Sequence, residues 1–228
     1  MSSRKEEKER LKQEREERER AAAAKARRAR LLQLIGGVVV ACAIIVGVAV
    51  AVSSGGGGDG ADNPDIDDDK LKAAAQTSGC VYRSFPDEGA EHASKTFTPD
   101  DYKTNPPTSG AHVPPGEQAQ DGLYVAGNEP GIGNWVHTLE HGRILLQYRP
   151  GSDKTVVTAL EKLFNEDVAD SGGAYHSVLM RNNTKMPFQV AAVAWRHYMA
   201  CREFTPETIA ALRTFRDELV DTAPEKVP

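Results

Sequence analysis

The sequence lacks the short motifs of two large groups of proteins. It contains neither a G-x-S-x-G nucleophile elbow nor a glycine-rich phosphate-binding loop, which mark serine α/β-hydrolases and nucleotide-binding P-loops. Ser109 could suggest a hydrolase triad with His112 and Asp121, but a serine three residues from its base in the same loop has poor triad geometry. These absences argue against both chemistries.

Charge is missing from one long segment. Residues 31–52 read LLQLIGGVVVACAIIVGVAVAV and carry no charged side chain. As a helix with a rise of ~1.5 Å per residue the run spans ~33 Å, enough to cross the hydrocarbon layer. Ala49-Val50-Ala51 resembles a signal-peptide cleavage site, but signal h-regions are ~7–15 residues long and follow short leaders. We therefore predict a retained transmembrane anchor over 31–52.

The charge balance changes sign across that segment. Residues 1–30 hold 12 of the 28 basic and 7 of the 33 acidic side chains, so the remainder holds 16 basic and 26 acidic ones. Basic flanks remain cytoplasmic. We therefore predict a single-pass plasma-membrane protein whose N-terminus, a charged helix over 1–30, is cytoplasmic. The larger part is extracytoplasmic, with the lipid bilayer and other envelope proteins as partners. Its acidity argues against a nucleic-acid partner.

Beyond the anchor, composition predicts a linker and one domain. Residues 53–77 begin with a run rich in Gly, Ser and Asp, which is typical of a flexible, solvated spacer. Residues 78–228 can form one extracytoplasmic domain of the α+β class. Its first half is rich in turn-forming residues, and its second half predicts the order β-α-β-β-α. The strands are expected over 144–148, 175–180 and 188–195, and the helices after Ser152 and Thr205.

The chain has three cysteines, of which Cys42 lies in the apolar run. Cys80 and Cys201 both follow the anchor, so they form the only intramolecular pair available outside the membrane. An oxidising compartment favours a disulfide between them. A reactive or metal-binding thiol is the alternative.

Histidines are concentrated in one stretch. Four of the six lie between positions 92 and 141, namely His92, His112, His137 and His141. On a helical turn, the i, i+4 spacing of His137 and His141 puts both imidazoles on one face. Together with His112 and with His92 as a fourth ligand, they could bind zinc or copper, and Glu140 would orient a histidine from the outer shell. The alternative is that the histidines hydrogen-bond to loop backbone.

Two other ligand sets are weaker. His137-x-x-Glu140-His141 matches the inverted zinc-peptidase motif, with Glu203 or Glu207 as a downstream ligand. However, Gly142 predicts a single helical turn, whereas that motif needs a helix continuing past its second histidine. The late methionines could favour copper(I), particularly Met199, which shares a strand face with His197; we expect them in the core instead. They are Met180, Met186 and Met199.

Longer motifs point to a family. The sequence YKTNPPTSGAH at 102–112, Gly122-Leu123-Tyr124, VHTLEHGRILLQY at 136–148 and Ala194-Trp195 resemble an uncharacterised bacterial family of membrane-anchored ectodomains, the domain of unknown function 3105. Ala111 stands where that pattern has proline. The resemblance covers roughly residues 78–220 and implies the domain boundary and the site residues, but no reaction.

Taken together, the sequence favours a membrane-anchored, histidine-rich module that binds copper or zinc or assists envelope assembly, with no catalytic residue assigned. The alternative from another class is a structural or interaction domain without metal. A zinc-dependent peptidase is the least favoured.

Overall fold

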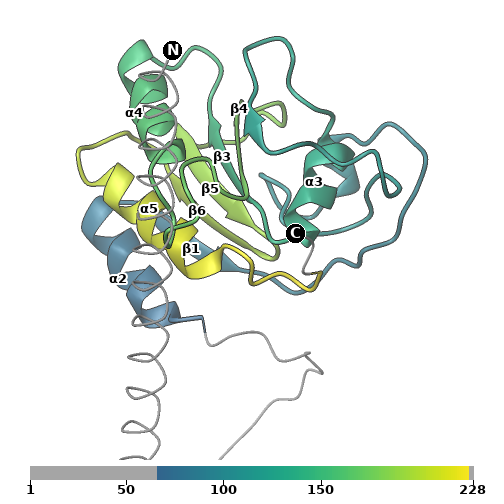
Figure 1. Ribbon diagram of the computed structural model, residues 1–228, viewed down its shortest axis with the longest axis horizontal. Coiled ribbons are helices and arrows are strands. Elements are labelled where there is room, and N and C mark those ends of the chain that lie inside the picture. Colours follow the sequence, from purple (N-terminus) through teal and green to yellow (C-terminus); the bar gives the residue numbers. More distant parts are fainter. Residues whose placement is uncertain (1–65, 226–228) are drawn as a thin grey trace, which may run out of the picture. The chain divides into compact units, whose positions relative to one another are not determined.

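The computed structural model of the protein describes residues 66–225, which contain a six-stranded mixed sheet with helices on both faces (Figure 1). The strand order is β1-β6-β5-β3-β4-β2. β3 and β2 each run parallel to β4, and the other neighbours are antiparallel. The strands are β1 (Val81–Ser84), β2 (Gly122–Leu123), β3 (Ile144–Tyr148), β4 (Ser177–Arg181), β5 (Val190–Ala194) and β6 (His197–Cys201).

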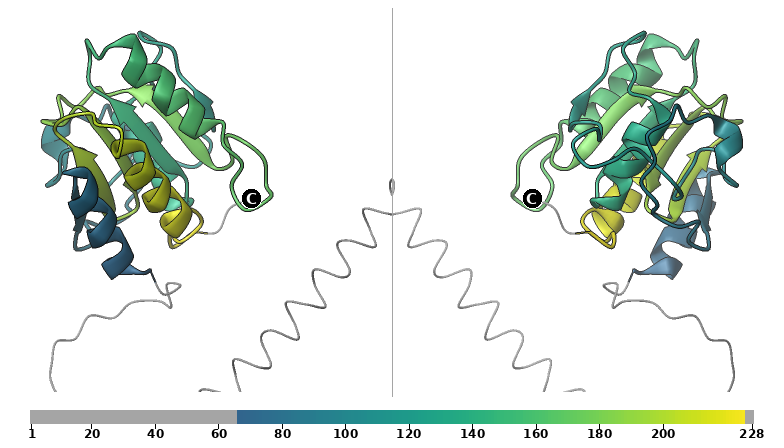
Figure 2. Two further views of the ribbon diagram at one scale, coloured as in Figure 1. Left: turned by 90° about the vertical axis from the view of Figure 1, so that its left-hand side faces the viewer. Right: turned by 90° about the vertical axis from the view of Figure 1, so that its right-hand side faces the viewer.

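The helices divide between the two faces. α2 (Asp68–Ser78), α4 (Lys154–Phe164) and α5 (Thr208–Leu219) cover one face, and α3 (Ile132–Glu140) lies on the other (Figures 1 and 2). Between β1 and α3 the chain forms only the short 3-10 helix η1 (Pro99–Asp101) and β2. This confirms the α+β class and the irregular first half.

Alternation along β3 separates two cores. Ile144 and Leu146 pack with the three-helix face, while Leu145 packs with the α3 face. All three are buried because both faces are covered, which is why this strand reads as an uninterrupted apolar run. The helix predicted after Ser152 is also confirmed as α4, whose buried residues recur at helical spacing: Val156, Leu160, Leu163 and Phe164.

The folded part begins earlier than predicted. α2 starts at Asp68, inside the segment expected to be a flexible linker up to residue 77. The Asp67 carboxylate caps the helix by accepting from the Lys70 N–H at 2.9 Å, and Leu71 is fully buried. The aspartates therefore start a helix instead of extending a spacer.

Three strands were missed, β1 and β2 in the irregular first half and β6 in the second. We predicted a strand up to Trp195, but β5 ends at Ala194 and β6 starts at His197. The two-residue turn between them, Trp195-Arg196, contains none of the residues that signal hairpins. Tertiary hydrogen bonds hold it instead: the Arg196 N–H donates to Thr108 O at 2.9 Å and the Phe85 N–H donates to Arg196 O at 2.8 Å.

The predicted disulfide is confirmed. Cys80 and Cys201 are bonded across a sequence separation of 121 residues and tie the residue before β1 to the end of β6. The predicted anchor at 31–52 and the helix at 1–30 lie outside the described residues. Within 66–225, none of the helices has the length and apolar character needed to span a bilayer.

Candidate metal centre

α3 presents three of the predicted site residues. It is longer than the single turn expected, running from Ile132 to Glu140, and its end is set by Gly142 as predicted. Gly142 adopts φ 81° and donates its N–H to Leu139 O at 3.0 Å, the left-handed end of a helix that glycine permits. His137, Glu140 and His141 thus occupy the last turn and the residue after it.

A pinned loop brings His112 to α3. The Asn105 side-chain amide donates to Thr184 O at 3.0 Å, and the Thr184 hydroxyl donates back to Asn105 Oδ1 at 2.7 Å. Nearer the histidine, the Tyr102 hydroxyl donates to Ala111 O at 2.9 Å. These bonds fix the PPTSG loop, so His112 is placed by residues distant in sequence.

His92 reaches the same point through a short bridge between chain segments. The His112 N–H donates to Glu91 O at 3.0 Å, and the Ala93 N–H donates to His112 O at 2.8 Å. The His92 and His112 rings consequently lie 4.8 Å apart between centroids, and those of His92 and His137 lie 5.0 Å apart. His92 is exposed, so it forms the solvent side of the cluster.

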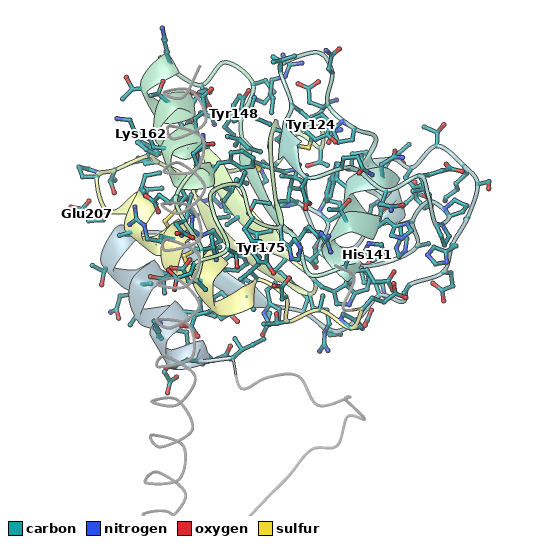
Figure 3. The ribbon with its side chains drawn as sticks, viewed as in Figure 1. Tyr124, His141, Tyr148, Lys162, Tyr175 and Glu207 are labelled. Carbon is teal, nitrogen blue, oxygen red and sulfur yellow. A yellow bond between two sulfur atoms is a disulfide. The ribbon has the colours of Figure 1, made fainter. Side chains whose placement is uncertain are left out.

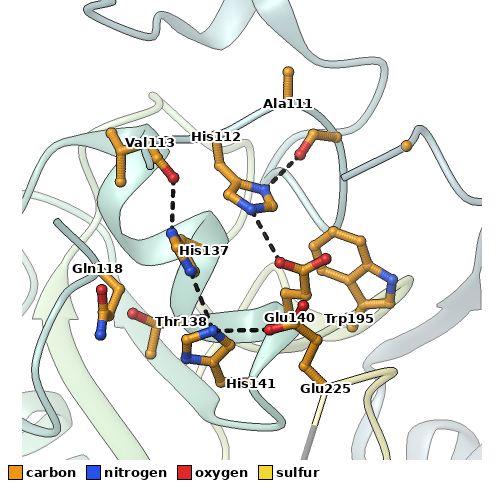
Figure 4. Close-up of polar contacts among 12 residues, drawn as sticks. Ala111, His112, Val113, Gln118, His137, Thr138, Glu140, His141, Trp195 and Glu225 are labelled. Atoms are coloured by element: carbon orange, nitrogen blue, oxygen red, sulfur yellow. Dashed lines mark hydrogen bonds and ion pairs between the residues drawn. The ribbon is translucent and has the colours of Figure 1, made fainter. Parts of the chain in front are cut away.

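Four side chains converge. Each of them offers one ligand atom, and these atoms all lie within 4.8 Å of one another; they belong to His92, His112, His137 and Glu140. Figure 4 shows the last three. The last three are buried. Glu140, which we expected as an outer-shell orienter, therefore has its carboxylate among the potential ligands.

The hydrogen bonds of the imidazoles define their tautomers. His112 Nδ1 lies 2.9 Å from Gly110 O, and His137 Nδ1 lies 2.8 Å from Val113 O. A carbonyl only accepts, so both Nδ1 atoms carry the hydrogen. When the rings are neutral, the Nε2 atoms of both histidines then carry a lone pair, and these lone pairs face the cluster. Backbone carbonyls orient metal-binding histidines in this way.

One contact in the cluster is left without a hydrogen bond. His112 Nε2 and Glu140 Oε2 lie 3.0 Å apart. Both atoms are buried, yet neither has a hydrogen-bond partner of acceptable geometry. With both atoms as acceptors the contact is repulsive, and it becomes favourable only when a proton on His112 Nε2 or a metal cation lies between them, because an unmatched buried polar atom is costly. The pair has the geometry of ligands to a shared ion.

The electrostatic environment keeps these groups in the forms that bind metals. Burial lowers the pKa of His137 to about 4, so its ring is neutral at neutral pH. Burial alone would raise the pKa of Glu140, but the contact with His112 and the neighbouring histidines outweigh it and the pKa falls. Neutral imidazole and ionised carboxylate are the ligand forms required.

His141 lies beside the four-residue cluster, in a second group. Its Nε2 is 3.1 Å from His137 Nε2 and 3.2 Å from Glu225 Oε2, and burial lowers its pKa. Glu140, His141 and Glu225 also offer ligand atoms within 4.8 Å of one another. Sequence reasoning missed Glu225, because it lies 84 positions after His141 in a segment without a motif.

The other predicted residues lie elsewhere. Glu207 and His141 are on opposite sides of the domain (Figure 3), so Glu207 cannot complete a zinc-peptidase site. His197 contacts the Tyr82 hydroxyl at 3.0 Å, and Ser109 accepts from the Glu88 N–H at 3.1 Å. Asp121 pairs with Arg143, which leaves no hydrolase triad. As expected, the methionines are buried in the core, at 180, 186 and 199.

The comparisons agree with the sequence motifs. A family model described as a protein of unknown function (DUF3105) matches residues 94–227. This stretch contains all the residues of both groups except His92. Neither a curated protein nor a solved structure shows significant similarity to the chain. The match covers more than half of the sequence, so the chain belongs to the DUF3105 family.

Proposed function

We propose that the domain binds one divalent transition-metal ion through His92, His112, His137 and Glu140, and that it does so at the outer face of a membrane. The contact between His112 Nε2 and Glu140 Oε2 carries the first part of this proposal. These are two buried atoms 3.0 Å apart without a hydrogen bond. An ion placed among the four ligand atoms would turn this repulsion into two bonds.

Modest movement would close the site. Zinc–nitrogen bonds of ~2.0–2.1 Å place tetrahedral ligand atoms ~3.3 Å apart, whereas the four atoms lie within 4.8 Å of one another. The exposed His92 has the most freedom to move inward. Because it also faces solvent, it provides the route by which an ion enters and leaves.

The donor set restricts the metal. Three imidazoles and one carboxylate suit Zn²⁺, Cu²⁺ and related divalent ions, whereas copper(I) prefers sulfur. Among the described residues, both cysteines are consumed in the disulfide and the three methionines belong to the core. We therefore favour Zn²⁺ or Cu²⁺ over Cu⁺, consistent with a role in metal handling or in assembly of a metal-dependent envelope complex.

Metal analysis of the full chain tests this function. The protein is purified in mild detergent without chelator, and its zinc and copper are quantified before and after equilibrium dialysis. Co²⁺ serves as a spectroscopic probe of the coordination. We expect His112→Ala and Glu140→Gln to weaken binding by more than ~100-fold, since changes to outer-shell residues alone cost ~10–100-fold. His197→Gln, which alters a histidine outside the cluster, is the matched control.

The same measurements distinguish metal binding from a purely structural role of the cluster. If the wild-type chain takes up no stoichiometric Zn²⁺, Cu²⁺ or Co²⁺, the cluster is a buried brace between the PPTSG loop and α3, and the domain is structural. His92→Ala guards against misfolding as a cause of lost binding, because this side chain is exposed and contributes little to the core.

We further propose that residues 31–52 anchor the chain with residues 66–225 on the outer side. The uncharged run and its basic flank support this topology, as does the Cys80–Cys201 disulfide, which is typical of an oxidising compartment. Protease added to intact cells is expected to remove the C-terminal domain. A domain that is cleaved only after lysis would contradict the proposal.

A further inference from the structure

We infer that the domain holds a second metal position formed by Glu140, His141 and Glu225, adjacent to the first and sharing the Glu140 carboxylate with it. This inference rests on the proposed function and extends it from one ion to two. The two groups of converging ligand atoms have one member in common, and that member is Glu140. A carboxylate has two oxygens and can bind one ion with each.

Two adjacent ions are compatible with the positions of the ligand atoms, because His137 and His141 fall in different groups. His137 Nε2 belongs to the first group and His141 Nε2 to the second, and they lie 3.1 Å apart. Each ring can therefore bind its own ion while the ions remain neighbours, in the range of ~3.5–4 Å typical of paired metal centres.

The alternative, a hydrogen bond between the rings, uses the contact between His141 and Glu225 less well. His137 Nε2 has no hydrogen when the ring is neutral, because its Nδ1–H donates to Val113 O at 2.8 Å. A hydrogen on His141 Nε2 would face both that lone pair and Glu225 Oε2, which is 3.2 Å away. One hydrogen cannot point straight at both acceptors, whereas a cation beside His141 satisfies the Glu225 carboxylate.

The chain is built to place Glu225 there. Its N–H donates to Glu140 O at 3.2 Å, and the Asp221 N–H donates to Gly142 O at 2.9 Å. The Asp221 carboxylate in turn contacts His176 Nδ1 at 2.5 Å and accepts from the Tyr175 hydroxyl at 2.9 Å. Residues 221–225 are thus docked along the end of α3, although Glu225 itself lies far from the sequence motif.

The second position is more open to solvent than the first, in which three of the four ligands are buried. The Glu225 side chain is 50% exposed, and His141 lines a polar pocket of about 130 Å³ together with Thr138, Arg143 and others. Three protein ligands leave at least one coordination position free. We expect this ion to exchange faster than the first and to carry a water molecule facing the pocket.

Stoichiometry of the full chain tests this inference. Calorimetric titration with Zn²⁺ and metal analysis are expected to show two ions per wild-type chain, one bound more tightly than the other. Glu225→Gln and His141→Ala should each reduce this to one ion, while the exposed Glu117→Gln, a carboxylate outside both groups, should retain two. With Co²⁺, magnetic coupling between the two ions should appear in the wild type and vanish in Glu225→Gln.

The outcomes separate the two proposals. A wild-type chain that binds a single ion, unaffected by Glu225→Gln, would overturn the second position and leave the first. Two ions that persist in both Glu225→Gln and His141→Ala would also overturn it. A wild-type chain that binds none would overturn both proposals together.

Discussion

The two faces of the sheet are stabilised in different ways. Under α2, α4 and α5 the core consists of apolar side chains such as Leu71, Leu160 and Phe215, and the disulfide lies among them. On the other face α3 also packs apolar residues against the strands. The long segment between β1 and α3 adds Phe97, Tyr102, Val113 and Ala119 to that core, but hydrogen bonds and the histidine cluster hold it as well.

Because the two faces are stabilised differently, we expect one to act as a permanent scaffold and the other to respond to a bound ion. Apolar packing and a covalent bond do not depend on an ion, so the three-helix face can serve as a permanent scaffold. The α3 face contains two buried polar atoms without a hydrogen-bond partner, His112 Nε2 and Glu140 Oε2, so under the proposed function its stability depends on the bound ion. Four changes would break or sharpen this contrast.

Loss of the disulfide should have the largest effect. Cys80→Ser/Cys201→Ser opens a loop of 121 residues, which is expected to lower the free energy of unfolding by ~4–5 kcal/mol in the chain-entropy model. Urea denaturation of the full chain measures this, with Cys42→Ser as the control. Since the bond lies on the three-helix face, the metal affinity of the molecules that remain folded should not change. A large loss of affinity would show that the faces are not independent.

Metal removal should be next and should affect the other face. An ion at 100 times its dissociation constant stabilises the folded state by ~2.7 kcal/mol, and chelation would remove that contribution. Hydrogen exchange with and without chelator is expected to show lost protection in residues 88–141, with little change in α4 and α5. Uniform loss across the chain would contradict the contrast.

Gly142→Ala tests how the C-terminal segment reaches the site. Both Gly142 and Gly151 have φ 81°, but an added Cβ would lie 2.9 Å from Asp221 Cα at Gly142 and meet nothing within 4 Å at Gly151. Both substitutions to alanine therefore introduce the same backbone strain of ~1–3 kcal/mol. Gly142→Ala should cost more than Gly151→Ala and should also weaken the second ion. Equal effects in denaturation and zinc titration would argue against a docked Glu225.

The smallest expected effect is a pH dependence on the three-helix face. Burial lowers the pKa of His197 to about 4, against ~6.5 in an unfolded chain. Between these values the unfolded chain takes up a proton that folded His197 does not, so the stability present above pH 6.5 is lost as the pH falls toward 4.

With allowance for partial exposure, this loss is ~1–2 kcal/mol. His197→Gln should remove that part of the difference in unfolding free energy between pH 7.5 and 4.5, measured with chelator present. Comparing the variant with the wild type cancels the contribution of the other histidines. An unchanged difference would mean that His197 does not contribute.

The features that depend on short-range physics could be predicted from the sequence. Helical periodicity located α4, glycine at 142 ended α3, and i, i+4 spacing placed His137 and His141 together. The disulfide could be predicted because Cys80 and Cys201 were the only pair available beyond the apolar run.

Which side chains meet at the site depends on long-range contacts in the fold. Glu140 joins the cluster because the PPTSG loop, pinned by Asn105 and Thr184, brings His112 to within 3.0 Å of it. Glu225 reaches His141 because residues 221–225 dock at Gly142. β6 forms although its turn lacks a hairpin signal, since Thr108 and Phe85 hold Arg196. These placements depend on hydrogen bonds between residues far apart in the chain, and periodicity, spacing and composition contain no record of such contacts.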